Sequence, residues 1–205
     1  MNITKPIKWH NTVQSIGCAV LLLFAAAGYA STEQVIVDQS LKQRLTAALS
    51  LNQKGVDRFD AEVWLVDMAN RLKKRLINKG YSEKELLTML QLVHLEARRA
   101  RLSPELILSV IQVESNFDRF AISRVGARGL MQVMPFWLKE LGRPRDNLFE
   151  LQTNLRFGCT ILRYYMDREK NNITRALARY NGSRGSYKYP NKVFKAQRTI
   201  WYKAP

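Results

Sequence analysis

Apolar residues recur at three- and four-residue steps along most of the chain, which is the spacing of one buried face of an α-helix. The first helix is predicted from about Asp60 to a stop near Gly80, with the face Val63, Trp64, Met68, Leu72, Leu76 and Ile77. Ser82 and Glu85 have the spacing of a capping box. They precede a second apolar face made of Leu86, Leu87, Leu90, Val93 and His94. We expect His94 to be a core or boundary residue.

A third helix is predicted to begin at Ser103, because Pro104 suits the first helical position and Glu105 the positive helix end. Its apolar face is Leu106, Ile107, Val110 and Ile111. Pro135 is expected to interrupt any helix begun by the apolar residues before it. Further helical spacing links Leu155, Ile161, Leu162 and Tyr165, then Ala176, Leu177 and Tyr180. No convincing alternating run predicts a strand, so the fold class is mainly α, with little or no sheet.

The N-terminal segment has the layout of a secretory signal. Lys5 and Lys8 precede an uncharged apolar run over 16–30 that closes in small residues before Ser31. The alternative is a membrane anchor, but the run is shorter than the roughly 20 residues that a bilayer requires. We therefore expect cleavage after Ala30, a periplasmic location and no stable membrane anchor. A short helix is expected over 35–51.

Composition limits the chemistry that the exported chain can perform. Its 33 Lys+Arg against 17 Asp+Glu give a formal net charge of +16, which favours an acidic partner. Export makes nucleic acid a poor candidate and favours an anionic wall polymer. After signal removal Cys159 and His94 are the only cysteine and histidine, so a disulfide, a Cys-His metal cluster and a Ser-His-Asp triad are not available. We expect a buried Cys159, no metal or cofactor, and carboxylate chemistry.

Glu114 is the candidate acid, because the apolar face of the third helix reaches it four residues after Val110. Burial and the negative end of the helix both disfavour the charged carboxylate, and a raised pKa suits a general acid near neutral pH. The alternative is a partly exposed glutamate that caps a loop or pairs with an arginine. Asp118, the nearest second acid, is either a loop cap or a nucleophile.

Three motifs in this order resemble those of the lytic transglycosylases with a lysozyme-like soluble-transglycosylase domain. They are Glu114-Ser115-Asn116-Phe117, then Ser123 with the run Gly-Ala-Arg-Gly-Leu-Met-Gln-Val-Met-Pro over 126–135, and Ala-Arg-Tyr-Asn-Gly over 178–182. The resemblance covers roughly 102–193. It implies a lysozyme-like catalytic domain over 102–205. The signal peptide (1–30) and an N-terminal helical extension (31–101) lie outside the resemblance, and since no Pro/Gly-rich linker separates the helices, we expect the extension and the catalytic part to form one compact unit.

The resemblance also implies roles for individual residues. Glu114 is expected to be catalytic, and the expected substrate-binding residues are Ser115, Ser123, Met131, Gln132, Tyr180 and Asn181. Met131 and Tyr180 could instead belong to the core, and Ser123 could hold a loop. The sequence departs from the family pattern at Arg119, at Arg179 and at Phe136-Trp137.

The implied reaction is cleavage of peptidoglycan between N-acetylmuramic acid and N-acetylglucosamine, with Glu114 as acid and then base, to give 1,6-anhydromuramyl ends. The residues alone indicate only glycan cleavage by one carboxylate. Candidate basic contacts to the substrate's carboxylates are Arg124, Arg128, Arg143 and Arg145. The alternatives are a lysozyme-type muramidase, a non-catalytic wall-binding or secretion-scaffold protein, and a basic helical nucleic-acid binder. Cell-wall or secretion machinery is a further candidate partner.

Overall fold

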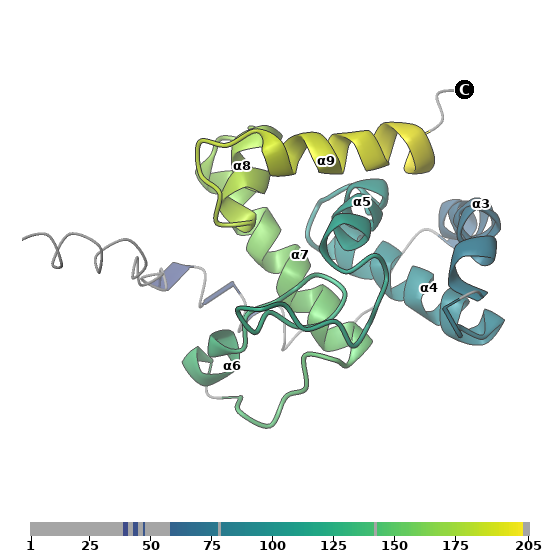
Figure 1. Ribbon diagram of the computed structural model, residues 1–205, viewed down its shortest axis with the longest axis horizontal. Helices are drawn as coiled ribbons and strands as arrows, with labels where there is room; N and C mark the ends of the chain where they lie inside the picture. Colours follow the sequence, from purple (N-terminus) through teal and green to yellow (C-terminus); the bar gives the residue numbers. More distant parts are fainter. Residues whose placement is uncertain are drawn as a thin grey trace, which may run out of the picture. The chain divides into compact units, whose positions relative to one another are not determined.

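The computed structural model describes residues 39–40, 43–44, 47, 58–77, 79–141 and 143–202. These residues form a succession of helices joined by turns (Figure 1). In chain order they are α3 (Arg58–Ile77), α4 (Glu83–Arg99), α5 (Pro104–Glu114), α6 (Phe136–Glu140), α7 (Leu151–Arg168), α8 (Ile173–Tyr180), α9 (Lys188–Ala196) and the π-helical turn η1 (Gln197–Trp201). Pairing between extended segments is limited, in the described ranges, to isolated bridges from Arg128 to Ile122 and to Val133. The predicted mainly α fold is confirmed.

The predicted starts of α4 and α5 are confirmed by their hydrogen bonds. The Ser82 hydroxyl accepts the Glu85 N–H (3.2 Å), and the Glu85 carboxylate accepts the Ser82 N–H (2.9 Å). In α5, the Ser103 hydroxyl accepts the Leu106 N–H (3.3 Å), and proline occupies the first turn. These bonds satisfy backbone donors that a helix leaves unpaired at its N-terminus, which fixes where each helix begins.

One hydrophobic core runs through the helices from Met68 to Trp201. Helix α4 packs against α3, α5 and α7, while α9 and η1 pack along α5 (Figure 1). The best-buried large side chains come from five of these elements and from the loop after α5: Leu72, Leu76, Met89, Leu90, Ile107, Leu108, Ile111, Phe117, Phe157 and Trp201. The core therefore holds α5, which carries Glu114, between α4 on one flank and α9 with η1 on another.

Two positions of the predicted apolar faces are wrong. Val63 is 57% exposed and Leu87 is 39% exposed, because the buried face of each helix is narrower than the run of apolar residues. His94 is buried and lies against the indole of Trp64 (ring centroids 5.1 Å apart), so its placement in the core is confirmed. Cys159 is buried, as predicted.

The two ends of the chain are described to different extents, and the sequence predicted them to different extents. The predicted signal segment lies outside the described residues, as does most of the helix predicted over 35–51, of which residues 39–40, 43–44 and 47 are helical. The C-terminal helix α9 and η1 were not predicted as elements. In the part of the chain that the structure describes, no helix combines the length and apolar character needed to cross a membrane.

Candidate active site

Glu114 is the last residue of α5 and is partly buried, at the position where the apolar face of that helix ends. The preceding turns of α5 bury Val110 and Ile111 completely, so the helix backbone is held in the core. The Glu114 Oε1 atom accepts a hydrogen bond of 2.7 Å from the hydroxyl of Tyr189, in the first turn of α9. The packing of α9 along α5 thus brings together two side chains that are distant in the sequence.

Burial raises the pKa of Glu114 from 4.5 to about 7, and the hydrogen bond from Tyr189 opposes this rise. At neutral pH a substantial fraction of the carboxyl groups is therefore protonated. A carboxyl that can give up a proton near pH 7, and can take one back as a carboxylate, meets the requirement for general acid and base catalysis by one residue.

A second tyrosine, Tyr180, is the last residue of α8. Its hydroxyl donates a hydrogen bond to the backbone carbonyl of Met131 (2.7 Å). Burial, and to a smaller extent the negative charge of Glu114, raise the pKa values of Tyr180 and Tyr189 well above 10. Both phenols are therefore neutral donors near pH 7, Tyr189 to the Glu114 carboxyl group and Tyr180 to the Met131 carbonyl.

Ser115, at the C-terminal cap of α5, connects the end of that helix to residues 129–132, the Gly-Leu-Met-Gln segment. Its hydroxyl lies 2.9 Å from the Leu130 carbonyl and 3.2 Å from the Ile111 carbonyl. Gln132 has a positive φ of 49°, and its side-chain amide donates to the carbonyl oxygens of Gly129 (2.9 Å) and Ala121 (3.2 Å). The structure thus brings Ser115 and this segment beside Glu114 and uses the Gln132 amide to stabilise the turn.

Met131 contributes its backbone to the site and its side chain to the core. The side chain is fully buried, with its sulfur 4.0 Å from the Cys159 sulfur. The Met131 N–H donates to Asn154 Oδ1 (2.8 Å), and the carbonyl accepts from Tyr180. For this side chain the core interpretation is confirmed.

Asn154, on α7, is a positioning residue that the sequence reasoning missed. Besides accepting the Met131 N–H, its amide donates to the carbonyl oxygens of Arg128 and Leu148, both at 2.8 Å. The amide lies against Gly129, which has a φ of +74° and where a Cβ would be 2.4 Å from Asn154 Nδ2. The available signal was an asparagine at helical spacing from the apolar residues Phe157 and Ile161, because an amide on a buried face must find partners.

The remaining predicted residues have local roles in the structure. The Ser123 hydroxyl accepts the Ala127 N–H (3.0 Å) and so closes the loop before the Gly-Leu-Met-Gln segment. Asn181 is exposed at the C-terminal cap of α8, where its N–H bonds to the Leu177 carbonyl (3.1 Å). Asp118 is exposed, and its carboxylate accepts the Phe120 N–H (2.9 Å), which is the geometry of a loop cap.

The comparison with protein families matches residues 91–201 to the transglycosylase SLT domain. The chain belongs to this family. The matched range begins within α4 and ends at η1, so it contains every residue of the site described above. The family expected from the three motifs is confirmed.

Curated relatives of the SLT domain include a transglycosylase of Enterobacteria phage PRD1, which is 36% identical over 100 residues. That match covers 46% of this chain and 37% of the phage protein. The membrane-bound lytic murein transglycosylase C of Yersinia pestis (strain Pestoides F) is 34% identical over 123 residues, which are 52% of this chain and 34% of that protein. The chain thus spans about a third of the length of these relatives.

Proposed function

We propose that the SLT domain is a peptidoglycan lytic transglycosylase, which cleaves the β-1,4 bond between N-acetylmuramic acid and N-acetylglucosamine without water. The observation that carries this proposal is the partly buried carboxyl group of Glu114, whose pKa burial raises to about 7. The family match and the relatives named transglycosylase support the same reaction class.

In the proposed first step, Glu114 gives its proton to the oxygen that links the two sugars. The bond from the muramyl anomeric carbon to that oxygen breaks, and the N-acetylglucosamine portion leaves with a free 4-hydroxyl. The acetamido group of the substrate stabilises the positive charge that develops at the anomeric carbon. Tyr189 donates to Oε1 of Glu114, which leaves Oε2 as the oxygen that faces the leaving group.

In the second step, the Glu114 carboxylate takes the proton of the muramyl 6-hydroxyl, and that oxygen bonds to the anomeric carbon. The product is a 1,6-anhydromuramyl end, and Glu114 has regained its proton. One carboxyl group thus serves as acid and base in turn. A retaining glycosidase would need a second carboxylate at the bond, and Asp118 is engaged in capping its own loop.

The proposed substrate contacts surround Glu114. Ser115 lies beside the acid, the backbone around Met131 and the Gln132 side chain contact the sugar N-acetyl groups, and Tyr180 lines the subsite where the bond breaks. The bonds from Ser115, Gln132 and Tyr180 to backbone carbonyls of residues 129–131 support this arrangement, because they hold the α5 end, the Gly-Leu-Met-Gln segment and α8 in one geometry. Ser123 and Asn181 complete the proposed set by shaping the loop and the wall of the site.

Digestion of purified sacculi, followed by mass spectrometry of the released fragments, tests the proposed function. Anhydromuropeptides are the expected product. Reducing muropeptides would instead identify a lysozyme-type muramidase, and the absence of any release would identify a wall-binding or scaffold protein. The outcome separates these functions because the anhydro form lacks one water relative to the reducing form.

For location, we propose export to the periplasm by an N-terminal signal that is removed after Ala30. The basic start and short apolar run support this proposal. Mass analysis of the protein from a periplasmic fraction is expected to find a mature start at Ser31. A chain retained in the membrane with its N-terminus intact would show that the segment is an anchor instead.

A further inference from the structure

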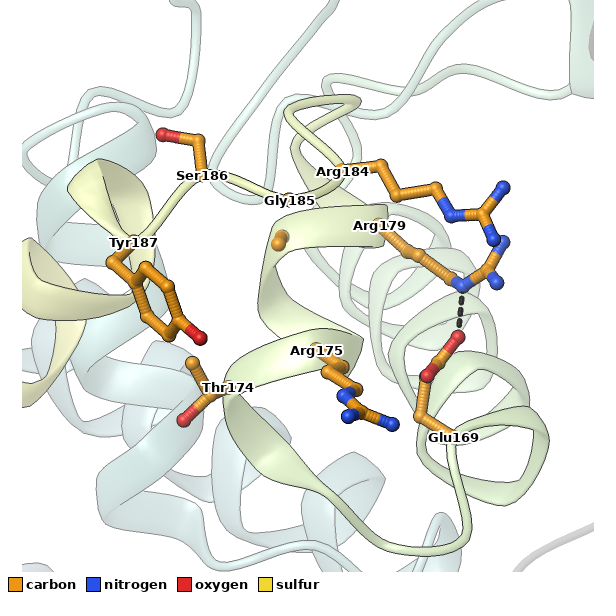
Figure 2. A pocket seen from close by; sticks show the side chains of 9 residues that line it. Glu169, Thr174, Arg175, Arg179, Arg184, Gly185, Ser186 and Tyr187 are labelled. Atoms are coloured by element: carbon orange, nitrogen blue, oxygen red, sulfur yellow. Dashed lines mark hydrogen bonds and ion pairs between the residues drawn. The ribbon is translucent and has the colours of Figure 1, made fainter.

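A hollow lies beside α8 and the start of α9, and Glu114 is not among the residues that line it. It is a cavity of about 260 Å³ whose lining includes Arg175, Arg179, Arg184, Glu169, Thr174 and Tyr187. We call it the arginine pocket. Figure 2 shows Arg179 and Arg184 extending in the same direction, with Tyr187 and Thr174 across from them.

The pocket carries an excess of positive charge. Its lining contains three guanidinium groups and one carboxylate. The carboxylate belongs to Glu169, at the end of α7, and accepts a hydrogen bond from Arg179 Nε. Because this bond uses Nε, the two terminal nitrogens of Arg179 can still donate to a ligand. Arg175 and Arg184 are exposed, and neither has an acidic partner among the described residues. Such a set of forked donors matches a carboxylate.

The arginine pocket is built from the same helices that supply the two active-site tyrosines. Arg179 directly precedes Tyr180 on α8, and Tyr187 comes two residues before Tyr189 at the start of α9. Each residue of an extended peptide spans ~3.5 Å. A peptide of a few residues that branches from a sugar near Tyr180 is therefore long enough to reach this pocket.

We infer that the arginine pocket binds a carboxylate of the stem peptide that the muramyl residue carries. The inference rests on the proposed function and names a substrate feature that the site recognises. The pocket makes the domain prefer strands whose peptides are still attached.

The test compares two soluble substrates: uncrosslinked glycan strands with stem peptides, and the same strands after an amidase has removed the peptides. The double variant R175Q/R184Q removes two exposed charges and leaves the Arg179–Glu169 pair in place. The matched control K84Q/R98Q removes two exposed charges from α4, which contributes nothing to the pocket lining. Circular dichroism verifies that each variant is folded.

For R175Q/R184Q, KM on peptide-bearing strands is expected to rise about tenfold or more, since bonds between charged groups are lost. The kcat, and both constants on peptide-free strands, should stay at the parent's values, and K84Q/R98Q should match the parent on both substrates. An equal change of KM on both substrates, or no change, would overturn the inference and leave the proposed function intact. If the parent chain cleaves neither substrate, the proposed function itself fails.

Discussion

The hydroxyl of Tyr189 donates a 2.7 Å hydrogen bond to the carboxyl group of Glu114, across 75 positions of sequence. The two side chains meet because α9 packs along α5. The bond holds one carboxyl oxygen in place and lowers the pKa of Glu114, while burial raises it more strongly. The pKa of Glu114 is thus set by burial, which raises it, and by one hydrogen bond, which lowers it.

Removing that hydrogen bond is predicted to make Glu114 a weaker acid. In Y189F burial remains but the donor is lost, so the pKa rises above about 7. Glu114 must begin the reaction protonated, so the pH at which kcat/KM falls on the alkaline side should rise by about one unit. That shift is the equivalent of one hydrogen bond to a charged group.

The matched control is Y180F, which loses a hydroxyl that donates to the Met131 carbonyl and not to Glu114. Its rate is expected to fall without a shift of the high-pH limb. The measurement is the pH profile of kcat/KM on soluble glycan strands for the parent and both variants. An unchanged profile in Y189F would show that this bond does not set the acid strength.

The raised pKa of Glu114 also predicts a pH dependence of stability. Between pH 4.5 and about 7 the folded state holds a proton that the unfolded state has released, so the free energy of unfolding falls as pH rises through this window. E114Q carries no such proton and lacks this slope. Above pH 7 the variant should be more stable than the parent by up to about 3 kcal/mol.

Urea unfolding followed by circular dichroism at pH 4, 6 and 8 tests this difference. The two proteins should be alike at pH 4, where the side chain of Glu114 is protonated in both states, and should diverge toward pH 8. Parallel stability curves for the parent and E114Q across this range would contradict the assigned pKa.

Two glycines of the same loop are predicted to differ sharply in their tolerance of alanine. In G129A the new Cβ would lie 2.4 Å from Asn154 Nδ2 and 2.6 Å from the Leu148 carbonyl, which displaces the amide that joins α7 to the Gly-Leu-Met-Gln segment. Gly126 also has a positive φ, of +85°, but nothing lies within 4 Å of a Cβ there. G126A therefore serves as the control for backbone strain alone.

Thermal and urea unfolding of both variants are the measurements. G126A is expected to lose about 1–2 kcal/mol from the left-handed backbone. G129A should lose at least about 3 kcal/mol, because buried hydrogen bonds of Asn154 are broken as well. Equal losses in the two variants would show that the Asn154 contact contributes little.

Local patterns were sufficient to predict the parts of the site that a single helix determines. The cap at Ser103 fixes where α5 begins, and helical spacing from Val110 places Glu114 on its buried face. The same reasoning failed for Val63 and Leu87, because spacing does not say how wide the covered face is. That width depends on which helices pack alongside.

The contacts that tune the site depend on tertiary packing and were not predicted. Tyr189, Val193 and Ala196 form a buried face of α9 at helical spacing, but that spacing does not show that α9 packs along α5, where Tyr189 meets Glu114. Asn154 bonds to the backbone of Arg128 and Met131, more than twenty residues earlier, and to that of Leu148, just before α7. Neither partner can be identified from spacing, since both depend on how separate segments approach one another.

In the proposed reaction, Glu114 alone delivers and retrieves the proton. The most direct test of this role is the rate at which purified E114Q releases anhydromuropeptides from sacculi, with D118N measured beside it and circular dichroism to confirm folding. E114Q keeps the size of the side chain but carries no transferable proton, so the rate should fall by at least about 10²- to 10⁴-fold. D118N should stay near the parent, because Asp118 is exposed and caps a loop. Near-normal release by E114Q, or loss of release in D118N, would contradict the account.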